Sequence, residues 1–193
     1  KGRAFYEREN LIQTIDELKI LLNLLDSEKS SKSDANFLFQ GKKLDAIIEK
    51  NLDKDFGEES FLLEPDNNVA DHIVYFYRIT SGHLRFLIQI HFIKNEFFLA
   101  STKVYSDSLL SKNDKQKVIS RIVSKYAPEA AEDTLEFNIK DPHGNILYTK
   151  DDVYYYINYL ANNSVTKELK VKYADYIAPS AGNEIKDTLD NLI

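Results

Sequence analysis

The segment from His72 to Tyr105 constrains the fold more than any other part of this chain. It contains three apolar and aromatic runs separated by two short polar turns, which predicts three consecutive antiparallel strands. Ser81-Gly82 is a favoured two-residue hairpin loop, because glycine readily adopts the positive φ angle that such a loop needs. With that loop Thr80 pairs with His83, and every other pair of the first hairpin follows from this one.

This pairing sorts the side chains of the hairpin onto two faces. One face is almost wholly apolar and is predicted to be core. The reverse face places His72 opposite His91 and Arg78 opposite Arg85, with hydrophobic neighbours. The reverse face is therefore the candidate ligand-binding face, and its candidate residues are His72, Phe76, Arg78, Arg85, Gln89 and His91.

The second turn admits two loops. A two-residue loop at Lys94-Asn95 would place Lys103 on the core face, where burial of its charge costs several kcal/mol. A three-residue loop that includes Glu96 avoids this cost and is the one we predict. The core face then receives Phe98, Ala100, Thr102 and Val104, and the reverse face receives Leu99, Ser101, Lys103 and Tyr105.

The polar pairs on the reverse face have alternative interpretations. His72 and His91 could bind a metal, but two ligands are too few for a zinc site, so we expect histidines tolerated on a half-solvated sheet face. Arg78 and Arg85 would repel each other unless internal carboxylates or a bound anion lie between them, and the abundant acids favour internal ion pairs. The sequence has no phosphate loop and no nucleophile or zinc motif, so we expect a non-enzymatic protein without metal or cofactor.

The amino-terminal part predicts a helix over residues 4–26. Apolar residues recur there at spacings of four and three, which is typical of a helix that buries a long seam. Additional leucines and isoleucines widen the seam, so the helix needs another surface to cover it. We expect this face to contact a protein partner through Leu11, Ile15, Leu18, Leu22 and Leu25.

Two short helical pieces are predicted next, at residues 35–40 and 44–52, separated by Gly41. The run Gln40-Gly41-Lys42-Lys43-Leu44-Asp45-Ala46 resembles the centre of a tetratricopeptide repeat, in which a glycine ends one helix and an alanine packs at the helix crossing. The resemblance covers about residues 27–58 and implies a helical hairpin, and we favour an ordinary helical hairpin over a true repeat. A charged stretch follows, so we predict a helical domain over residues 1–53 and a second domain over residues 57–193.

The second domain is predicted to be α+β. Residues 61–63, 134–139 and 146–148 indicate further strands, and residues 141–145 indicate the turn between the last two. Residues 118–127 and 151–160 indicate helices, and residues 169–173 alternate like a strand. Residues 184–192 are typical of a terminal helix. The order of elements resembles SnoaL-like or nuclear-transport-factor-like cone domains, which implies a curved antiparallel sheet packed with helices around a pocket. The fold class is thus α+β, with an amino-terminal helical hairpin followed by a curved antiparallel sheet.

Composition bounds the function. The 193 residues are 43% hydrophobic and 12% aromatic, which is ample for a packed core. The net charge of −6 argues against nucleic acid as the main partner. There is no cysteine and no apolar run long enough for a membrane span. A first residue other than methionine is typical of a processed fragment.

Our leading hypothesis is a non-enzymatic interaction or scaffold protein of the bacterial cell envelope, located in the periplasm or associated with the envelope. Its partner is expected to be another envelope protein or a second copy of the chain. A cytoplasmic location is the alternative. The rival function is a small-molecule-binding or enzymatic cone whose semi-polar pocket uses the reverse face.

Overall fold

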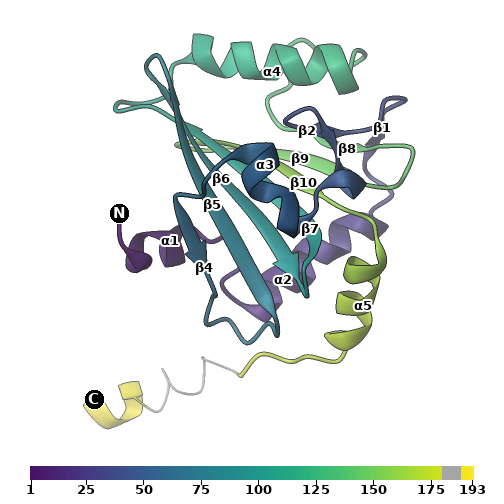
Figure 1. Cartoon of the computed structure of the whole chain (residues 1–193). Coiled ribbons are helices and arrows are strands. Elements are labelled where there is room, and N and C mark those ends of the chain that lie inside the picture. Colours follow the sequence, from purple (N-terminus) through teal and green to yellow (C-terminus); the bar gives the residue numbers. More distant parts are fainter. Residues whose placement is uncertain (180–187) are drawn as a thin grey trace.

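The protein is α+β, with one large and mostly antiparallel sheet and helices on both of its faces (Figure 1). The computed structural model describes residues 1–179 and 188–193. The eight strands lie in the order β1-β8-β9-β10-β7-β6-β5-β4, and only β1 and β8 run parallel. The sheet is not curled, so the predicted curvature is not confirmed.

The strand bounds follow the sheet from one edge to the other. They are β1 (Ser31–Lys32), β8 (Asn138–Lys140), β9 (Ile146–Asp151), β10 (Tyr155–Leu160), β7 (Glu96–Tyr105), β6 (Leu84–Ile93), β5 (His72–Ser81) and β4 (Phe61–Leu63). A separate small hairpin consists of β2 (Leu38–Phe39) and β3 (Lys42–Lys43). The helices are α1 (Arg3–Glu9), α2 (Ile15–Asn23), α3 (Leu52–Phe56), α4 (Lys112–Tyr126) and α5 (Ser164–Lys172), and the 3-10 turns are η1 (Leu24–Asp26), η2 (Leu44–Ala46) and η3 (Glu49–Asn51).

The predicted meander is confirmed as β5, β6 and β7, but its first register is shifted. The loop is Gly82-His83, with Gly82 at a φ of 59°, and Ser81 pairs with Leu84. The pairing is therefore shifted by two residues, and an even shift keeps every side chain on its predicted face. The shift does change the partners. Arg78 faces Leu87 and Arg85 faces Thr80, so the predicted arginine pair is wrong.

The second turn has the shorter loop, contrary to our prediction. Lys94 and Asn95 form it with φ angles of 48° and 68°, values suited to a tight hairpin. A bulge after His91 then restores the predicted alternation, because Ala100 pairs with Ile90. Lys103 therefore lies on the reverse face as predicted. The bulge residue Phe98 is the exception, because it packs on the histidine rings of the reverse face.

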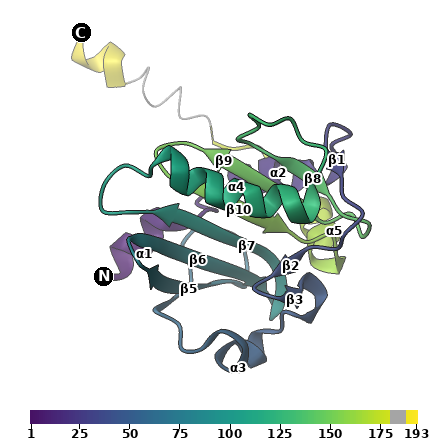
Figure 2. The ribbon, with the colours of Figure 1, turned by 90° about the horizontal axis from the view of Figure 1, so that it is seen from above.

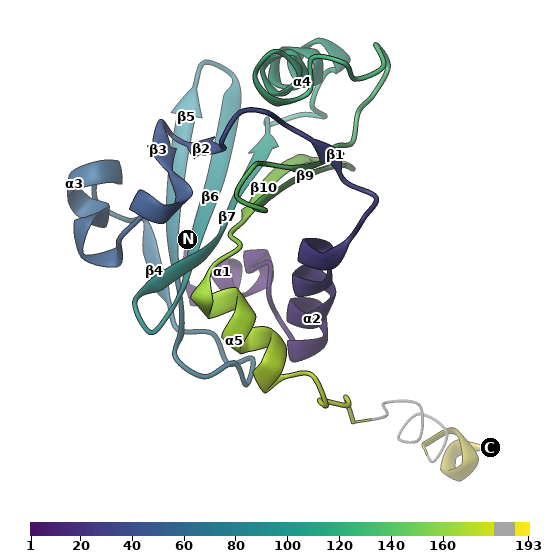
Figure 3. The same cartoon turned by 90° about the vertical axis from the view of Figure 1, so that its right-hand side faces the viewer.

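The sheet separates two layers of packing (Figure 3). The predicted core face, called the first face below, is covered by α4 and by the segment from β2 to α3, and Figure 2 shows α4 lying across it near β9 and β10. The reverse face, called the second face, is covered by α1, α2 and α5. None of the helices that the structure describes is long and apolar enough to pass through a bilayer.

The helix predicted at residues 4–26 is interrupted. The side chain of Asn10, the residue after α1, accepts a hydrogen bond from Ile12 N and donates one to Ile12 O. Thr14 then caps α2 by accepting a hydrogen bond from Glu17 N. Short polar side chains that bond to the backbone compete with helix continuation, which explains the break.

The helical hairpin predicted within residues 27–58 is wrong. Gln40 and Gly41 have φ angles of 48° and 78°, and they form the tight turn between β2 and β3 rather than a helix end. The 3-10 turns η2 and η3 and the short α3 follow. Phe37, Phe39 and Leu52 lie in the same hydrophobic cluster as the first face of the sheet. The division into domains 1–53 and 57–193 as independently folding units stays a prediction.

Two regions after residue 150 have the opposite secondary structure to the one predicted: a predicted helix is a strand, and a predicted strand is helical. The region predicted as a helix at 151–160 contains β10, which pairs with β7 and β9 and places Tyr155 and Tyr159 on the first face. The region predicted as a strand at 169–173 belongs to α5 and the residue after it, because an asparagine–threonine capping box starts that helix. Of the predicted terminal helix, residues 184–187 lie outside the described residues, and residues 188–192 are helical.

Candidate functional site

Three of the candidate ligand-binding residues come together, but they are covered by the amino-terminal segment. His72 Nε2 lies 2.8 Å from His91 Nδ1, and His91 Nε2 lies 2.8 Å from Gln89 Oε1. His72 is 4% exposed, Gln89 is 4% exposed and His91 is fully buried. The segment between α1 and α2 closes over them, so these residues are inside the protein and do not line an open pocket.

The direction of each hydrogen bond in this network is fixed from both ends. Asn67 Oδ1 accepts a hydrogen bond from Val69 N, so its Nδ2 group donates to Ile12 O and to His72 Nδ1. His72 Nδ1 is then an acceptor, and its Nε2–H donates to His91 Nδ1. His91 Nε2–H donates in turn to Gln89. One proton on each imidazole satisfies the whole chain, so both histidines are neutral.

Gln89 ties the network to the backbone of the amino-terminal segment. Its Oε1 also accepts a hydrogen bond from Leu11 N at 2.8 Å, and its Nε2 donates to Glu9 O at 2.8 Å. Burial lowers the pKa of His72 to about 4. Burial, and then the neighbouring His72, lowers the pKa of His91 well below its usual value. The network therefore acts as a neutral polar link between the sheet and the α1–α2 connection.

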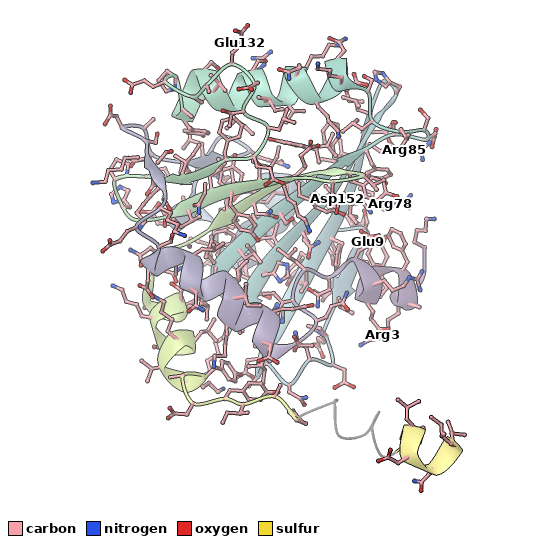
Figure 4. The ribbon with its side chains drawn as sticks, turned by 180° about the vertical axis from the view of Figure 1, so that it is seen from behind. Arg3, Glu9, Arg78, Arg85, Glu132 and Asp152 are labelled. Carbon is pink, nitrogen blue, oxygen red and sulfur yellow. The ribbon has the colours of Figure 1, made fainter. Side chains whose placement is uncertain are left out.

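The other three candidates of that face lie apart from the histidines. Phe76 is fully buried beneath α1, where it packs on Tyr6. Arg78 and Arg85 lie above α1 at the end of the sheet nearer α4 (Figure 4). Arg85 pairs with Asp107 at 2.9 Å in an exposed contact. The six residues thus form a buried network, a core contact and two surface charges rather than one site.

The candidate partner face of the amino-terminal helix is covered by the chain's own sheet. Its buried members join the cluster of the second face with Phe98, Leu99 and Leu160, and they are Ile15, Leu18, Leu22 and Leu25. Leu11 packs against the same cluster and is partly buried. The wide apolar seam is therefore explained by packing within this chain.

A serine, a histidine and an aspartate meet where the β5–β6 turn approaches α4. His83 Nε2 lies 2.8 Å from Asp114 Oδ2, and Ser111 Oγ donates to the same oxygen at 2.8 Å. These hydrogen bonds, the one from His83 first, lower the pKa of Asp114. Ser111 donates to the carboxylate and not to the imidazole, so no base activates this serine as a nucleophile. Ser111 and Asp114 cap the start of α4, and the contact between His83 and Asp114 attaches the β5–β6 turn to this helix.

A groove of about 820 Å³ lies on another part of the surface. It lies where the β2–η2 region, the β6–β7 turn, the β8–β9 turn and the start of α5 meet. We call it the amide groove, because asparagines line it from four segments: Asn36, Asn95, Asn145, Asn162 and Asn163. None of the sequence-predicted site residues lines it.

Its walls are held by hydrogen bonds among buried and half-buried polar groups. Asp141 Oδ1 accepts from His143 N and Asn145 N, and its Oδ2 accepts from Phe37 N and Asn145 Nδ2. Asn145 Oδ1 accepts from Asn162 N, which joins the β8–β9 turn to the loop before α5. The buried carboxylate of Asp141 thus joins the segment at Phe37 to the β8–β9 turn, and Asn145 joins that turn to the loop before α5.

Gly144 sits in this wall, and we expect its replacement by alanine to destabilise the protein. It has a φ of 81°, and an added Cβ would lie 2.6 Å from Asn162 Nδ2. Gly41 has a φ of 78° with open space around its Cβ position, so Gly41→Ala is a matched control. Urea denaturation should show a loss of about 2 to 3 kcal/mol for Gly144→Ala and about 1 kcal/mol for Gly41→Ala. Equal losses would contradict the predicted clash.

The ligand-facing side chains of the amide groove are those that the wall does not use. Asn36, Asn95, Lys43, Lys167 and the ring of His143 are exposed and have no hydrogen bond or ion pair within the described residues. Among the contributing segments is the turn at residues 141–145, which the sequence predicts only as local structure. Nothing local indicates that these segments meet.

Among the described residues there is no group of three His, Asp or Glu side chains that could hold a metal ion. Comparison with family models, with curated proteins and with solved structures gives no match to this chain. The resemblances to tetratricopeptide repeats and to cone domains therefore receive no support from relatives, and the site rests on geometry.

Proposed function

We propose that this chain is a non-enzymatic binding protein that holds a segment of a protein partner in the amide groove. The observation that carries the proposal is the contrast within that groove. The side chains of Asp141, Asn145, Asn162 and Asn163 form the hydrogen bonds that fix its walls, whereas a second set of exposed polar side chains has no partner in the described part of the chain. A rigid wall with free donors and acceptors is the arrangement expected of a preformed binding site.

The chemistry of the groove favours polypeptide over a ligand of one charge sign. Lys43 and Lys167 bring positive charge, and Asp45 and Glu96 bring negative charge, to the same rim. The free amides of Asn36 and Asn95 each offer a donor and an acceptor, which is what a peptide bond requires. Because these two lysines and two carboxylates balance, the rim offers no net positive charge to hold a phosphate-rich ligand. The location in the bacterial envelope stays a prediction from the sequence.

The proposal moves the partner surface from residues 11–25 to the amide groove, because the earlier face is buried. It also replaces the pocket predicted around His72 and His91. Those side chains are internal and neutral, which supports a structural role for them. A binding role for the protein thus remains the leading hypothesis, with a different surface.

A random-peptide display library, selected on the immobilised protein, tests the proposal. We expect enriched peptides that bind the purified protein, and we expect Lys43→Glu/Lys167→Glu to weaken that binding at least tenfold by calorimetry. Each exposed charge contributes modestly alone, but reversal replaces attraction by repulsion at two points of one site.

The matched control is Lys54→Glu/Lys112→Glu, which makes the same change of charge at exposed lysines outside the groove. The control should bind like the unaltered chain. Equal weakening in both double variants would show a nonspecific charge effect, and selected peptides that bind the groove variant normally would place the site elsewhere.

A further inference from the structure

A second cavity system lies on the first face of the sheet, away from the amide groove. An inner chamber of about 120 Å³ and an outer groove of about 260 Å³ share Gln40, Ile79 and Ile88 in their walls. We call the two together the apolar trough. Strands β5, β6, β7 and β10 form its floor, and the turn between β2 and β3 forms one wall.

The outer part of the trough is mostly hydrophobic. Phe86, Ile88 and Ile157 line it, together with the partly buried Tyr159 and with Phe39 from β2. Ile79 is 44% exposed at its mouth. The cover of the first face is thus incomplete between the β2–β3 hairpin and the end of β5.

A residue that lines the inner chamber carries an unsatisfied polar group. Tyr77 is 5% exposed and lines the chamber, and its hydroxyl has no hydrogen-bond partner among the described residues. Buried polar groups are nearly always paired, because leaving one unpaired costs about 1 to 3 kcal/mol. An unpaired hydroxyl beside an apolar groove marks the position where a ligand's polar group would bind.

The charges around Tyr77 restrict that polar group. Burial raises the pKa of Tyr77 to about 12, and the nearby Glu59 and Asp53 add to the rise. The hydroxyl therefore stays protonated and able to donate. The same carboxylates and Glu58 in the chamber wall outnumber Arg78, which also lines the chamber, and together they disfavour an anionic head group. A neutral hydroxyl or carbonyl on an apolar body fits the chamber and the trough together.

We propose that the apolar trough binds a neutral amphipathic small molecule, whose hydroxyl or carbonyl group accepts a hydrogen bond from Tyr77 and whose apolar part lies along Phe86, Ile88 and Ile157. This site is separate from the amide groove and does not depend on the peptide-binding proposal. The candidate pocket predicted from the sequence lies on the second face, whereas this trough lies on the first face, which was predicted to be core.

Calorimetry with 1-octanol and with octanoate tests the site on the full chain. The two probes have the same carbon chain length and differ in the charge of the head group. We expect saturable binding of octanol and at least tenfold weaker binding of octanoate. Tyr77→Phe should weaken octanol binding about fivefold without lowering the thermal midpoint, since it removes a hydroxyl that has no partner in the free protein.

A second pair of variants keeps the test decisive if Tyr77→Phe does not fold. Ile79→Asp places a charge at the exposed mouth and should abolish octanol binding, whereas Ile20→Asp, at a position 68% exposed on α2, should leave it unchanged. The Lys43→Glu/Lys167→Glu variant should also bind octanol normally. No saturable binding of octanol, equal binding of both probes, or full affinity in Ile79→Asp would overturn the proposal.

Discussion

Replacing Gln89 with leucine is expected to lower the free energy of unfolding by about 3 to 5 kcal/mol. Leucine is similar in volume but offers no hydrogen bond. The change leaves the His91 Nε2–H and Leu11 N–H groups without an acceptor and Glu9 O without a donor. Each buried group that loses its partner costs about 1 to 3 kcal/mol, and the amino-terminal segment loses its attachment to the sheet at the same time. Urea denaturation followed by circular dichroism measures the loss.

The matched control is Gln116→Leu on α4, where the side chain is half-buried and makes no hydrogen bond within the described residues. It should change stability by less than about 0.5 kcal/mol. A loss below about 1 kcal/mol for Gln89→Leu would mean that the α1–α2 connection does not depend on this network.

Acid is expected to destabilise the protein through the same network. The pKa of His72 is about 4 in the folded protein and 6.5 in an unfolded chain, so the unfolded state binds more protons between these values. The stability that the neutral His72 contributes is therefore complete above pH 6.5 and is lost as the pH falls towards 4. The difference corresponds to about 3 kcal/mol, and the lowered pKa of His91 acts in the same direction.

The variant His72→Gln separates this effect from the titration of carboxylates. A glutamine can accept from Asn67 with its oxygen and donate to His91 with its nitrogen, which preserves the direction of the chain of hydrogen bonds. Unfolding free energies measured in urea from pH 7.5 to pH 4.5 should fall less steeply for His72→Gln than for the unaltered protein. Parallel curves would show that His72 does not carry the acid sensitivity.

Much of the sheet was predictable because its signal is local. Alternation of apolar and polar residues sorted the faces of β5, β6 and β7 correctly except at the bulge residue Phe98, even though both turns were assigned to the wrong loop. The first loop was predicted at Ser81-Gly82 and lies one residue later, at Gly82-His83. This moves each residue of β5 to a partner two positions further along β6, so the faces are unchanged. The second turn has a two-residue loop, and the bulge at Phe98 adds one residue to β7. Beyond the bulge, the residues of β7 therefore have the partners on β6 that the predicted three-residue loop would give them.

The errors in element type arise where two periodicities fit the same short run. Residues 151–160 contain apolar side chains compatible with either a helix or a strand, and pairing with β7 and β9 decided for the strand. The buried apolar residues of α5 and its C-cap residue are Val165, Leu169 and Tyr173, at a helical spacing of four. The exposed Val171 made the same region look like an alternating strand.

The candidate sites were less predictable than the fold, because each depends on residues far apart in the sequence. The histidines and Gln89 were correctly grouped, but their exposure depends on the segment between α1 and α2, which covers them. The amide groove joins segments near residues 36, 95, 143 and 163, and none of them carries a recognisable motif alone.

The sequence by itself determined the α+β class, the three-stranded meander and the sorting of its side chains onto two faces, because alternation along a strand is set by the chain's own geometry. Only the tertiary structure decided which face of the sheet is open. The amino-terminal seam buries itself on the second face and encloses the polar residues there, whereas the short β2–β3 hairpin leaves part of the first face uncovered. Whether a sheet face is buried depends on which distant segment packs on it, and the local periodicity of a strand does not determine that segment.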